Sequence, residues 1–228
     1  MANRVDHVSI SVPDLGTGVE AYTALGFALQ TTDVAAVAYT ATAALELVAA
    51  GEPYGLRYIG LIGEAPEDVD RALPVRFVKR PPRGDPPGRH PNEVLHLERT
   101  YIVVPDLQAS LDAYAHVLGL PVPPVQQGNV IKADMCIFDV GPVGIGVAQP
   151  NGPGPAAQAL ERRGPGPFQV LYRTRSMNAA AECIESHGLP RPVLGTRNTG
   201  EQAMLVGPEH TFGVFVAFVG GLDGASAR

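Results

Sequence analysis

The sequence has few cysteines, no long apolar run and no excess of basic residues, and each lack excludes a class of protein. Its two cysteines, Cys136 and Cys183, are too few and too far apart for a disulfide framework, so we expect both to be reduced and buried. No segment approaches the roughly 20 apolar residues of a membrane span, and the first residues do not resemble a signal peptide. We therefore expect a cytoplasmic protein with no membrane partner.

The 228 residues carry a formal net charge of −6, and 18% of them are charged. An acidic chain opposes binding to the phosphate backbone, which needs a concentrated basic surface. Nucleic acid is excluded as an expected partner, and a small molecule is the expected one.

A strand-and-helix pattern occurs twice, as DHVSISVPDL at residues 6–15 and as RTYIVVPDL at residues 99–107. Alternating apolar residues indicate a strand in each copy. The aspartate of the following Pro-Asp pair is placed to cap a helix, because its carboxylate can accept from the first free backbone N–H groups. The first polar side chain differs between the copies, His7 in one and Arg99 in the other.

Two weaker copies begin near residues 56 and 168, so the chain predicts four strand-helix-strand units of roughly fifty residues. The second unit is short of at least one strand, and its helix is expected from Pro66. Segments 79–92 and 149–167 are rich in proline and glycine and are predicted to be loops, linkers or lids.

These four units resemble the vicinal oxygen chelate superfamily, which includes glyoxalase I, extradiol dioxygenases, methylmalonyl-CoA epimerase and bleomycin-resistance proteins. The resemblance implies an α+β fold in which four βαβββ-type units, the second truncated, pair into two half-open β-cups. It implies an N-terminal glyoxalase-like domain at residues 1–97 and a C-terminal one at residues 98–228. It specifies the fold better than the reaction, because the superfamily hosts many activities.

The resemblance also assigns metal ligands to the first and last strands of each unit. In the first cup the matching residues are His7, Glu46 and Tyr58. His7 and Glu46 suit a divalent metal such as Fe, Mn, Ni or Zn, and Glu46 is also the one candidate general base. The third ligand is His96, or His90 if the proline-rich loop folds over the cup. Alternatively these are structural side chains and the protein holds no metal.

In the second cup the matching positions include Arg99 and Gly146 and cannot hold the usual metal. The side chains at alternating positions of its two first strands suit a carboxylate, enolate or phosphate, because arginine offers a planar fork of donors. Alternatively, Arg99 pairs with an acid such as Glu201 or Asp134, and the segment around Arg197 lines a ligand or forms a polar turn. The predicted substrate-binding residues of this cup are Arg99, Tyr101, Gln169 and Arg173.

Three functions remain open at this point. The first is a glyoxalase-type or dioxygenase-type enzyme, a lyase, isomerase or dioxygenase that stabilises an enolate-like or oxygen-chelated intermediate of a small oxygenated or anionic substrate. The second is a metal-free binding or drug-sequestering resistance protein that uses the arginine-lined cup. The third is a structural relic whose cups are filled by side chains. A monomer and a homodimer are both compatible with the sequence.

Overall fold

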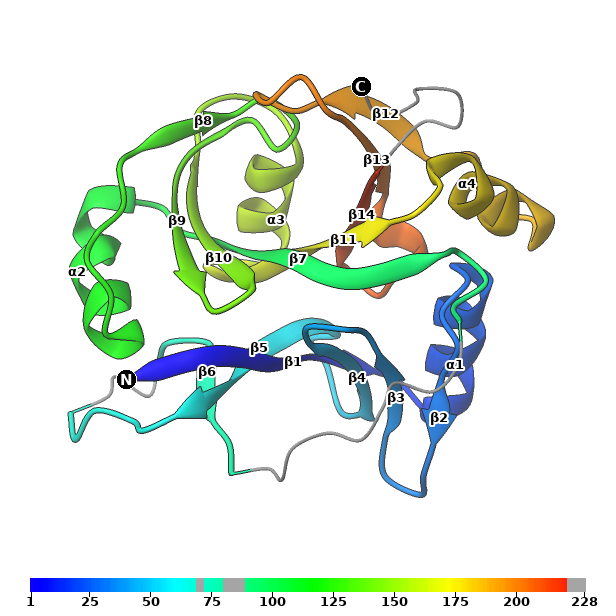
Figure 1. Cartoon of the computed structure of the whole chain (residues 1–228), viewed down its shortest axis with the longest axis horizontal. Coiled ribbons are helices and arrows are strands. Elements are labelled where there is room, and N and C mark those ends of the chain that lie inside the picture. The colour runs from blue at the N-terminus through cyan, green and yellow to red at the C-terminus, as the bar shows by residue number, and fades with distance from the viewer. Residues whose placement is uncertain (69–71, 80–88, 221–228) are drawn as a thin grey trace.

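Two curled β-sheets pack face to face in the computed structural model, which describes residues 1–68, 72–79 and 89–220 (Figure 1). The six-stranded sheet has the order β2-β3-β4-β1-β5-β6, and the eight-stranded sheet has the order β12-β13-β14-β11-β7-β10-β9-β8. The predicted α+β fold of two half-open sheets is confirmed. Within the described ranges, no helix has the length and apolar composition needed to cross a bilayer.

The strands and helices have the following bounds. The first sheet contains β1 (Ala2–Val12), β2 (Gln30–Thr31), β3 (Ala36–Tyr39), β4 (Ala44–Ala49), β5 (Gly55–Gly63) and β6 (Val75–Phe77). The second contains β7 (Val94–Val103), β8 (Gln126–Gly128), β9 (Ala133–Val140), β10 (Val143–Pro150), β11 (Gly166–Thr174), β12 (Val193–Thr196), β13 (Gln202–Val206) and β14 (Phe215–Val219). The helices are α1 (Leu15–Ala24), α2 (Leu107–Leu118), α3 (Pro155–Arg163), α4 (Met177–Ser186) and the short 3₁₀ helix η1 (Pro208–His210).

The centre of each sheet follows one rule of pairing. The first strand of a unit runs parallel to the last strand of the same unit, as β1 does with β4 and β7 with β10. It runs antiparallel to the first strand of the next unit, as β1 does with β5 and β7 with β11. The second unit contributes only β5 and β6 within the described residues. Its predicted helix falls partly on residues 69–71, outside the described residues, and residues 66–68 are not helical.

The two Pro-Asp pairs begin helices as predicted. The Asp14 carboxylate accepts from the Thr17 backbone N–H at 2.8 Å, and the Asp106 carboxylate accepts from Ala109 N–H at 3.0 Å. Each helix therefore has one of its free N-terminal donors satisfied by the residue that the sequence places there. α2 ends at Gly119, whose φ of 68° is readily adopted by glycine.

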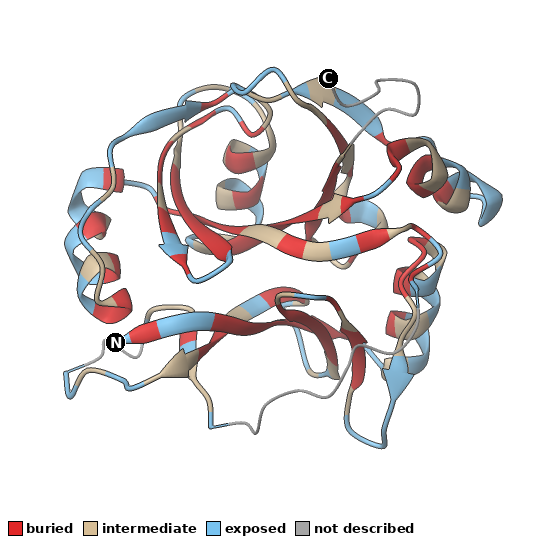
Figure 2. Cartoon of the chain, in the orientation of Figure 1, coloured by how far each residue is buried: buried red, intermediate tan, exposed pale blue. Residues whose placement is uncertain are grey.

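One hydrophobic cluster fills the space between the two sheets. Val8 and Ile10 of β1 belong to it together with Ile102 of β7, and all three are fully buried. Figure 2 shows buried residues along the central strands of both sheets. The division into domains at residues 1–97 and 98–228 stays a prediction; the strands of the two sheets separate between Phe77 and Val94.

A helix occupies part of the segment that the sequence predicted as a loop. α3 lies inside the curl of the eight-stranded sheet (Figure 1), where its buried residues Ala156 and Ala159 join a second hydrophobic cluster with Tyr101 and Phe168. The prediction for residues 149–167 was wrong because proline and glycine flank this helix on both sides and mask its short apolar face. Both cysteines are free, but Cys183 is only half-buried.

Candidate functional site

A β-bulge near the start of β1 places two adjacent side chains together. Val5 pairs with Leu61 of β5 and His7 pairs with the next partner residue, Gly60, so Asp6 is the extra residue of the bulge. In a regular strand Asp6 and His7 would point to opposite faces, whereas a bulge re-aims one of them. The two side chains instead form a buried pair, with His7 Nδ1 2.9 Å from Asp6 Oδ2.

His7 is the centre of a closely packed polar cluster. Its Nε2 lies 3.4 Å from Glu46 Oε2 on β4 and 3.4 Å from the Tyr58 hydroxyl on β5. Because the Asp6 carboxylate accepts hydrogen bonds only, it fixes a proton on His7 Nδ1. The imidazole is fully buried, and a methyl group in place of the Gly60 hydrogen would lie 2.3 Å from its Cε1 atom. The imidazole therefore fills the space that a side chain at position 60 would need.

An equivalent bulge occurs in β7, the corresponding strand of the second sheet. Leu97 and Arg99 pair with consecutive residues of β11, so Glu98 is the extra residue here. Glu98 and Arg99 occupy the same places in β7 that Asp6 and His7 occupy in β1. The bulge brings an acidic side chain beside the residue that follows it in both sheets.

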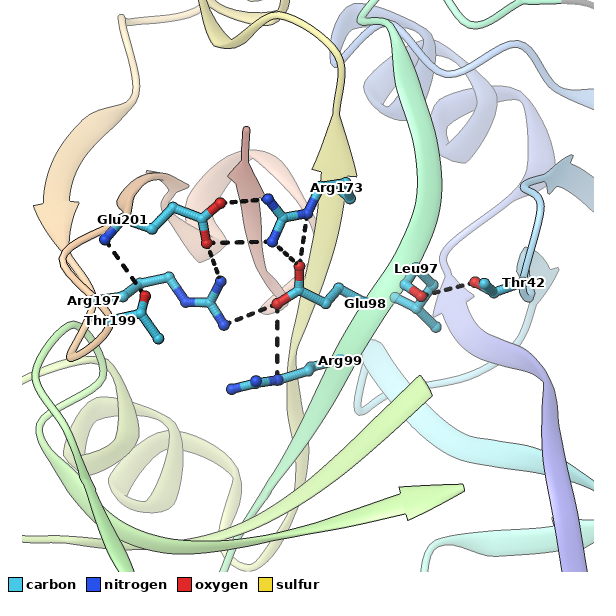
Figure 3. Close-up of polar contacts among 8 residues, drawn as sticks. All are labelled: Thr42, Leu97, Glu98, Arg99, Arg173, Arg197, Thr199 and Glu201. Atoms are coloured by element: carbon cyan, nitrogen blue, oxygen red, sulfur yellow. Dashed lines mark hydrogen bonds and ion pairs between the residues drawn. The ribbon is translucent and has the colours of Figure 1, made fainter. Parts of the chain in front are cut away.

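Glu98 belongs to an ion-pair cluster at the mouth of the second cup (Figure 3). Arg173 donates to both Glu98 and Glu201, and Arg197 donates to Glu98 at 2.8 Å and to Glu201 at 2.5 Å. Arg99 is held more weakly, with Nε 3.8 Å from Glu98 Oε1. Three guanidiniums thus face two carboxylates, which leaves one positive charge unbalanced among the described residues.

A cavity of about 90 Å³ lies inside the second cup, beside this cluster. Arg99, Tyr101 and Gln169 all line it. Gln169 Oε1 is buried and accepts no hydrogen bond from any described residue. The Tyr101 hydroxyl has no hydrogen-bond partner in the described ranges either. A cation, a phenol and an amide acceptor therefore converge on one small space with unused hydrogen-bonding capacity.

Two glycines of β10 make room for these side chains. A methyl group on Gly146 would lie 2.4 Å from the Tyr101 ring, and one on Gly144 would lie 3.1 Å from Arg99 Cγ. The alternating glycines of the sequence VGIGV therefore indicate a strand over which large side chains of a neighbouring strand can lie. Both glycines lie within β10.

The second cup also uses residues that the sequence left undecided. Arg197 and Thr199, from the segment between β12 and β13, line the cavity, so this segment is part of the cup wall. Glu98 was not among the residues predicted from the sequence, although it has the same position in the second repeat that Asp6 has in the first. Arg173 and Arg99 both lie beside Glu98, but the guanidinium of Arg173 donates its hydrogen bonds to Glu98 and Glu201.

Solved structures with the same arrangement include two enzymes. A triple mutant of 4-hydroxymandelate synthase from Streptomyces coelicolor aligns with a TM-score of 0.66 at 13% identity, over 100% of this chain and 95% of that chain. Methylmalonyl-CoA epimerase from Mycobacterium tuberculosis aligns with a TM-score of 0.50 at 20% identity, over 59% of this chain and 94% of that chain. The chain has the vicinal oxygen chelate fold. No protein-family model and no curated protein matches the sequence.

The metal ligands that the resemblance implied for the first cup do not come together as a complete set among the described residues. His7 and Glu46 meet, but His96 lies on β7 of the other sheet, opposite Arg173. No group of three His, Cys, Asp or Glu side chains within the described residues is arranged to hold a metal ion. Two protein donors fall short of the three that an open metal site uses.

His90, the alternative third ligand, has both ring nitrogens engaged. Nδ1 accepts from the Ala28 N–H at 3.0 Å and Nε2 donates to the Tyr39 carbonyl at 2.8 Å. Burial lowers the pKa of His90 below its usual value despite the bond to Tyr39. This histidine therefore joins the segment after α1 to the end of β3 as a neutral side chain.

The buried pair of Asp6 and His7 predicts a large loss of stability in His7→Ala. Removing the imidazole takes a hydrogen-bond partner from a buried carboxylate, so we expect the free energy of unfolding to fall by about 3 kcal/mol. Ser9→Ala is the matched control on the same strand, because Ser9 Oγ is buried and bonds to no described residue. Denaturant unfolding measures both variants. Equal, small losses in the two variants would contradict the structural role of His7.

The Glu98 cluster predicts acid sensitivity. Burial raises the pKa of Glu98, but the hydrogen bond from Arg173 and the charges of Arg197 and Arg173 outweigh it, so the pKa lies below its usual value of about 4.5. The stabilisation is fully present above pH 4.5 and is lost as the pH falls through the lower, folded-state pKa. We expect Glu98→Gln to lose about 1–2 kcal/mol at pH 7, since the pairs are partly exposed.

The difference between Glu98→Gln and the wild type should shrink as the pH falls from about 4.5 towards 3. Denaturant unfolding at a series of pH values measures it. The control is Glu182→Gln on the exposed side of α4, which should differ little from the wild type at any pH. A difference that stays constant down to pH 3 would show that the ionised form of Glu98 is not what stabilises the fold.

Proposed function

We propose that this chain is a small-molecule enzyme of the vicinal oxygen chelate type that takes a small acid with two neighbouring oxygen groups into the cup of the eight-stranded sheet. The observation that carries the proposal is the convergence of Arg99, Tyr101 and Gln169 on one cavity with unused hydrogen-bonding capacity. Burying a polar group without a hydrogen-bond partner is unfavourable unless a ligand supplies that partner.

The chemistry of the lining defines the substrate class. Arg99 carries the unbalanced charge of the cluster and suits a carboxylate. Gln169 Oε1 is an acceptor, so it suits a hydroxyl or enol O–H of the ligand. A cavity of about 90 Å³ favours a small ligand, because a site for a single water needs roughly 10–15 Å³ of such a volume.

The same groups support an enolate-like intermediate. Negative charge that develops on a substrate oxygen beside Arg99 is stabilised by the cation, and the Tyr101 hydroxyl can donate to that oxygen. Arg99 and Tyr101 take these positions without a substrate, since Arg99 Nε lies 3.8 Å from Glu98 Oε1 and the Tyr101 ring packs against Gly146. Glu46, the general base predicted from the sequence, lies in the first sheet beside His7, and we do not place it in this cup.

A metal-free binding protein is the second candidate. It is favoured by Glu98, the carboxylate beside Arg99, because burial is outweighed by the hydrogen bond from Arg173 and the charges of Arg197 and Arg173, which lower its pKa. A carboxylate held in this way is a poor proton acceptor. The two candidates share the ligand class and differ in whether the bound ligand reacts.

Pyruvate and lactate fit the proposed site as probes. For an enzyme, we expect the wild-type protein to catalyse exchange of the pyruvate methyl protons in D₂O, observed by proton NMR, because solvent takes a methyl proton as the enol forms and returns a deuteron when the ketone is restored. Arg99→Gln should slow this exchange at least about tenfold, since one charge-assisted hydrogen bond is lost. Arg162→Gln, an exposed arginine on α3, is the control and should exchange at the wild-type rate.

Calorimetric titration of the same proteins separates the remaining outcomes. Binding of lactate and pyruvate that depends on Arg99 but gives no proton exchange would favour the binding protein over the enzyme. If neither acid binds to the wild type, or if Arg99→Gln binds both as well as Arg162→Gln does, the cup is not the site of a small acid.

A further inference from the structure

A second cavity lies outside both cups. A cleft of about 770 Å³ opens between β5 and β6 of the first sheet and α2 and the end of α3. This volume falls within the usual range for small-molecule sites. Three arginines line it, Arg57, Arg76 and Arg163, and Glu52 is its one acidic lining residue in the described ranges. The cleft is therefore locally positive on a chain with a formal net charge of −6.

Arg163 is built into the cleft wall by residues of β5. It is the last residue of α3, and its Nη2 donates to the Leu56 carbonyl of β5 at 3.2 Å. A methyl group on Gly55 would lie 2.5 Å from its Nη1, and Gly55 has a φ of 117°. Glycine at this position therefore permits the close approach of the guanidinium.

The charge of Arg163 has no counterion within the described residues. Nε and Nη1 are both buried and form no hydrogen bond there. Burial lowers the pKa of this guanidinium, although arginine keeps its charge in proteins. A partly buried cation without an acidic partner is unfavourable, and an anion in the adjoining cleft would supply the missing charge.

The other two arginines provide accessible donors beside it. Arg57 and Arg76 are exposed, and neither has a carboxylate partner in the described part of the chain. Arg76 lies over the Tyr58 ring, with its Cζ 5.6 Å from the ring centroid. This contact holds Arg76 against the cleft wall. A guanidinium fork matches the oxygens of a phosphate, which has more acceptors and more charge than a carboxylate.

We infer that this cleft binds a phosphorylated small molecule, with its phosphate between Arg57 and Arg76 and facing the charge of Arg163. The volume leaves space for an organic part, and Tyr114 and Phe168 offer it apolar contacts. The inference does not rest on the function proposed for the cup, because the cleft and the cup cavity share no lining residue.

Calorimetric titration with ADP, inorganic pyrophosphate and adenosine tests the inference. We expect ADP and pyrophosphate to bind to the wild type, with affinities that fall as salt rises because two of the arginines are exposed. Adenosine, which lacks the phosphates, should bind at least about tenfold more weakly than ADP. Arg163→Gln and Arg76→Gln should each raise the dissociation constant of ADP at least about tenfold.

Two controls keep this result interpretable. Arg162→Gln removes an exposed charge next in sequence to Arg163 and should bind ADP within about twofold of the wild type. Arg76→Gln changes an exposed side chain, so it tests the cleft even if Arg163→Gln fails to fold. The inference is overturned if neither ADP nor pyrophosphate binds to the wild type, or if Arg76→Gln binds ADP as tightly as Arg162→Gln.

Discussion

A β-bulge at the start of each repeated strand decides which side chains meet in this protein. It adds Asp6 opposite β5 in the first sheet and Glu98 opposite β11 in the second. In a regular strand, Asp6 and Glu98 would each point away from the side chain of the next residue and towards the apolar layer between the sheets. An unpaired carboxylate there would be strongly unfavourable. The bulge therefore allows a buried acid in the first copy and a half-buried one in the second, and the residue after it, His7 or Arg99, determines what the acid does.

The two sheets use this shared backbone for opposite purposes. In the first, the acid meets one imidazole, and the space is closed by Glu46, Tyr58 and the near approach of Gly60. The result is a packed cluster in which His7 is fully buried. In the second, the acid meets arginines that outnumber the carboxylates, and Arg99 and Tyr101 lie over Gly144 and Gly146 beside a cavity of about 90 Å³. An excess charge beside a cavity favours a ligand, which is why the second cup rather than the first is the candidate site.

Local patterns allowed much of the fold to be predicted, and long-range pairing explains the rest. Alternation and the two capping aspartates depend on near neighbours in the sequence, so the helices α1 and α2 and the repeat were correctly expected. A bulge depends on the register with a partner strand, which the sequence of one strand does not contain. His96 was assigned to the first cup, but it lies on β7. The repeated motif begins at Arg99, whereas β7 already begins at Val94. The partners of Arg173 come from β7 and from the residue just before β13, so Glu98 and Glu201 could not be paired with it in advance.

α3 connects the two cavities physically, although it lies in a segment that was expected to be a loop. Its small residues Ala156 and Ala159 pack inside the curl of the second sheet, and the Ala156 N–H donates to the carbonyl of Ile131, a residue that lines the cup cavity. The other end of the same helix carries Arg163 across to β5, where it forms part of the cleft. A helix of nine residues moves largely as one body because its backbone bonds are internal. The packing that sets the width of the cup therefore also fixes the position of the buried charge in the cleft.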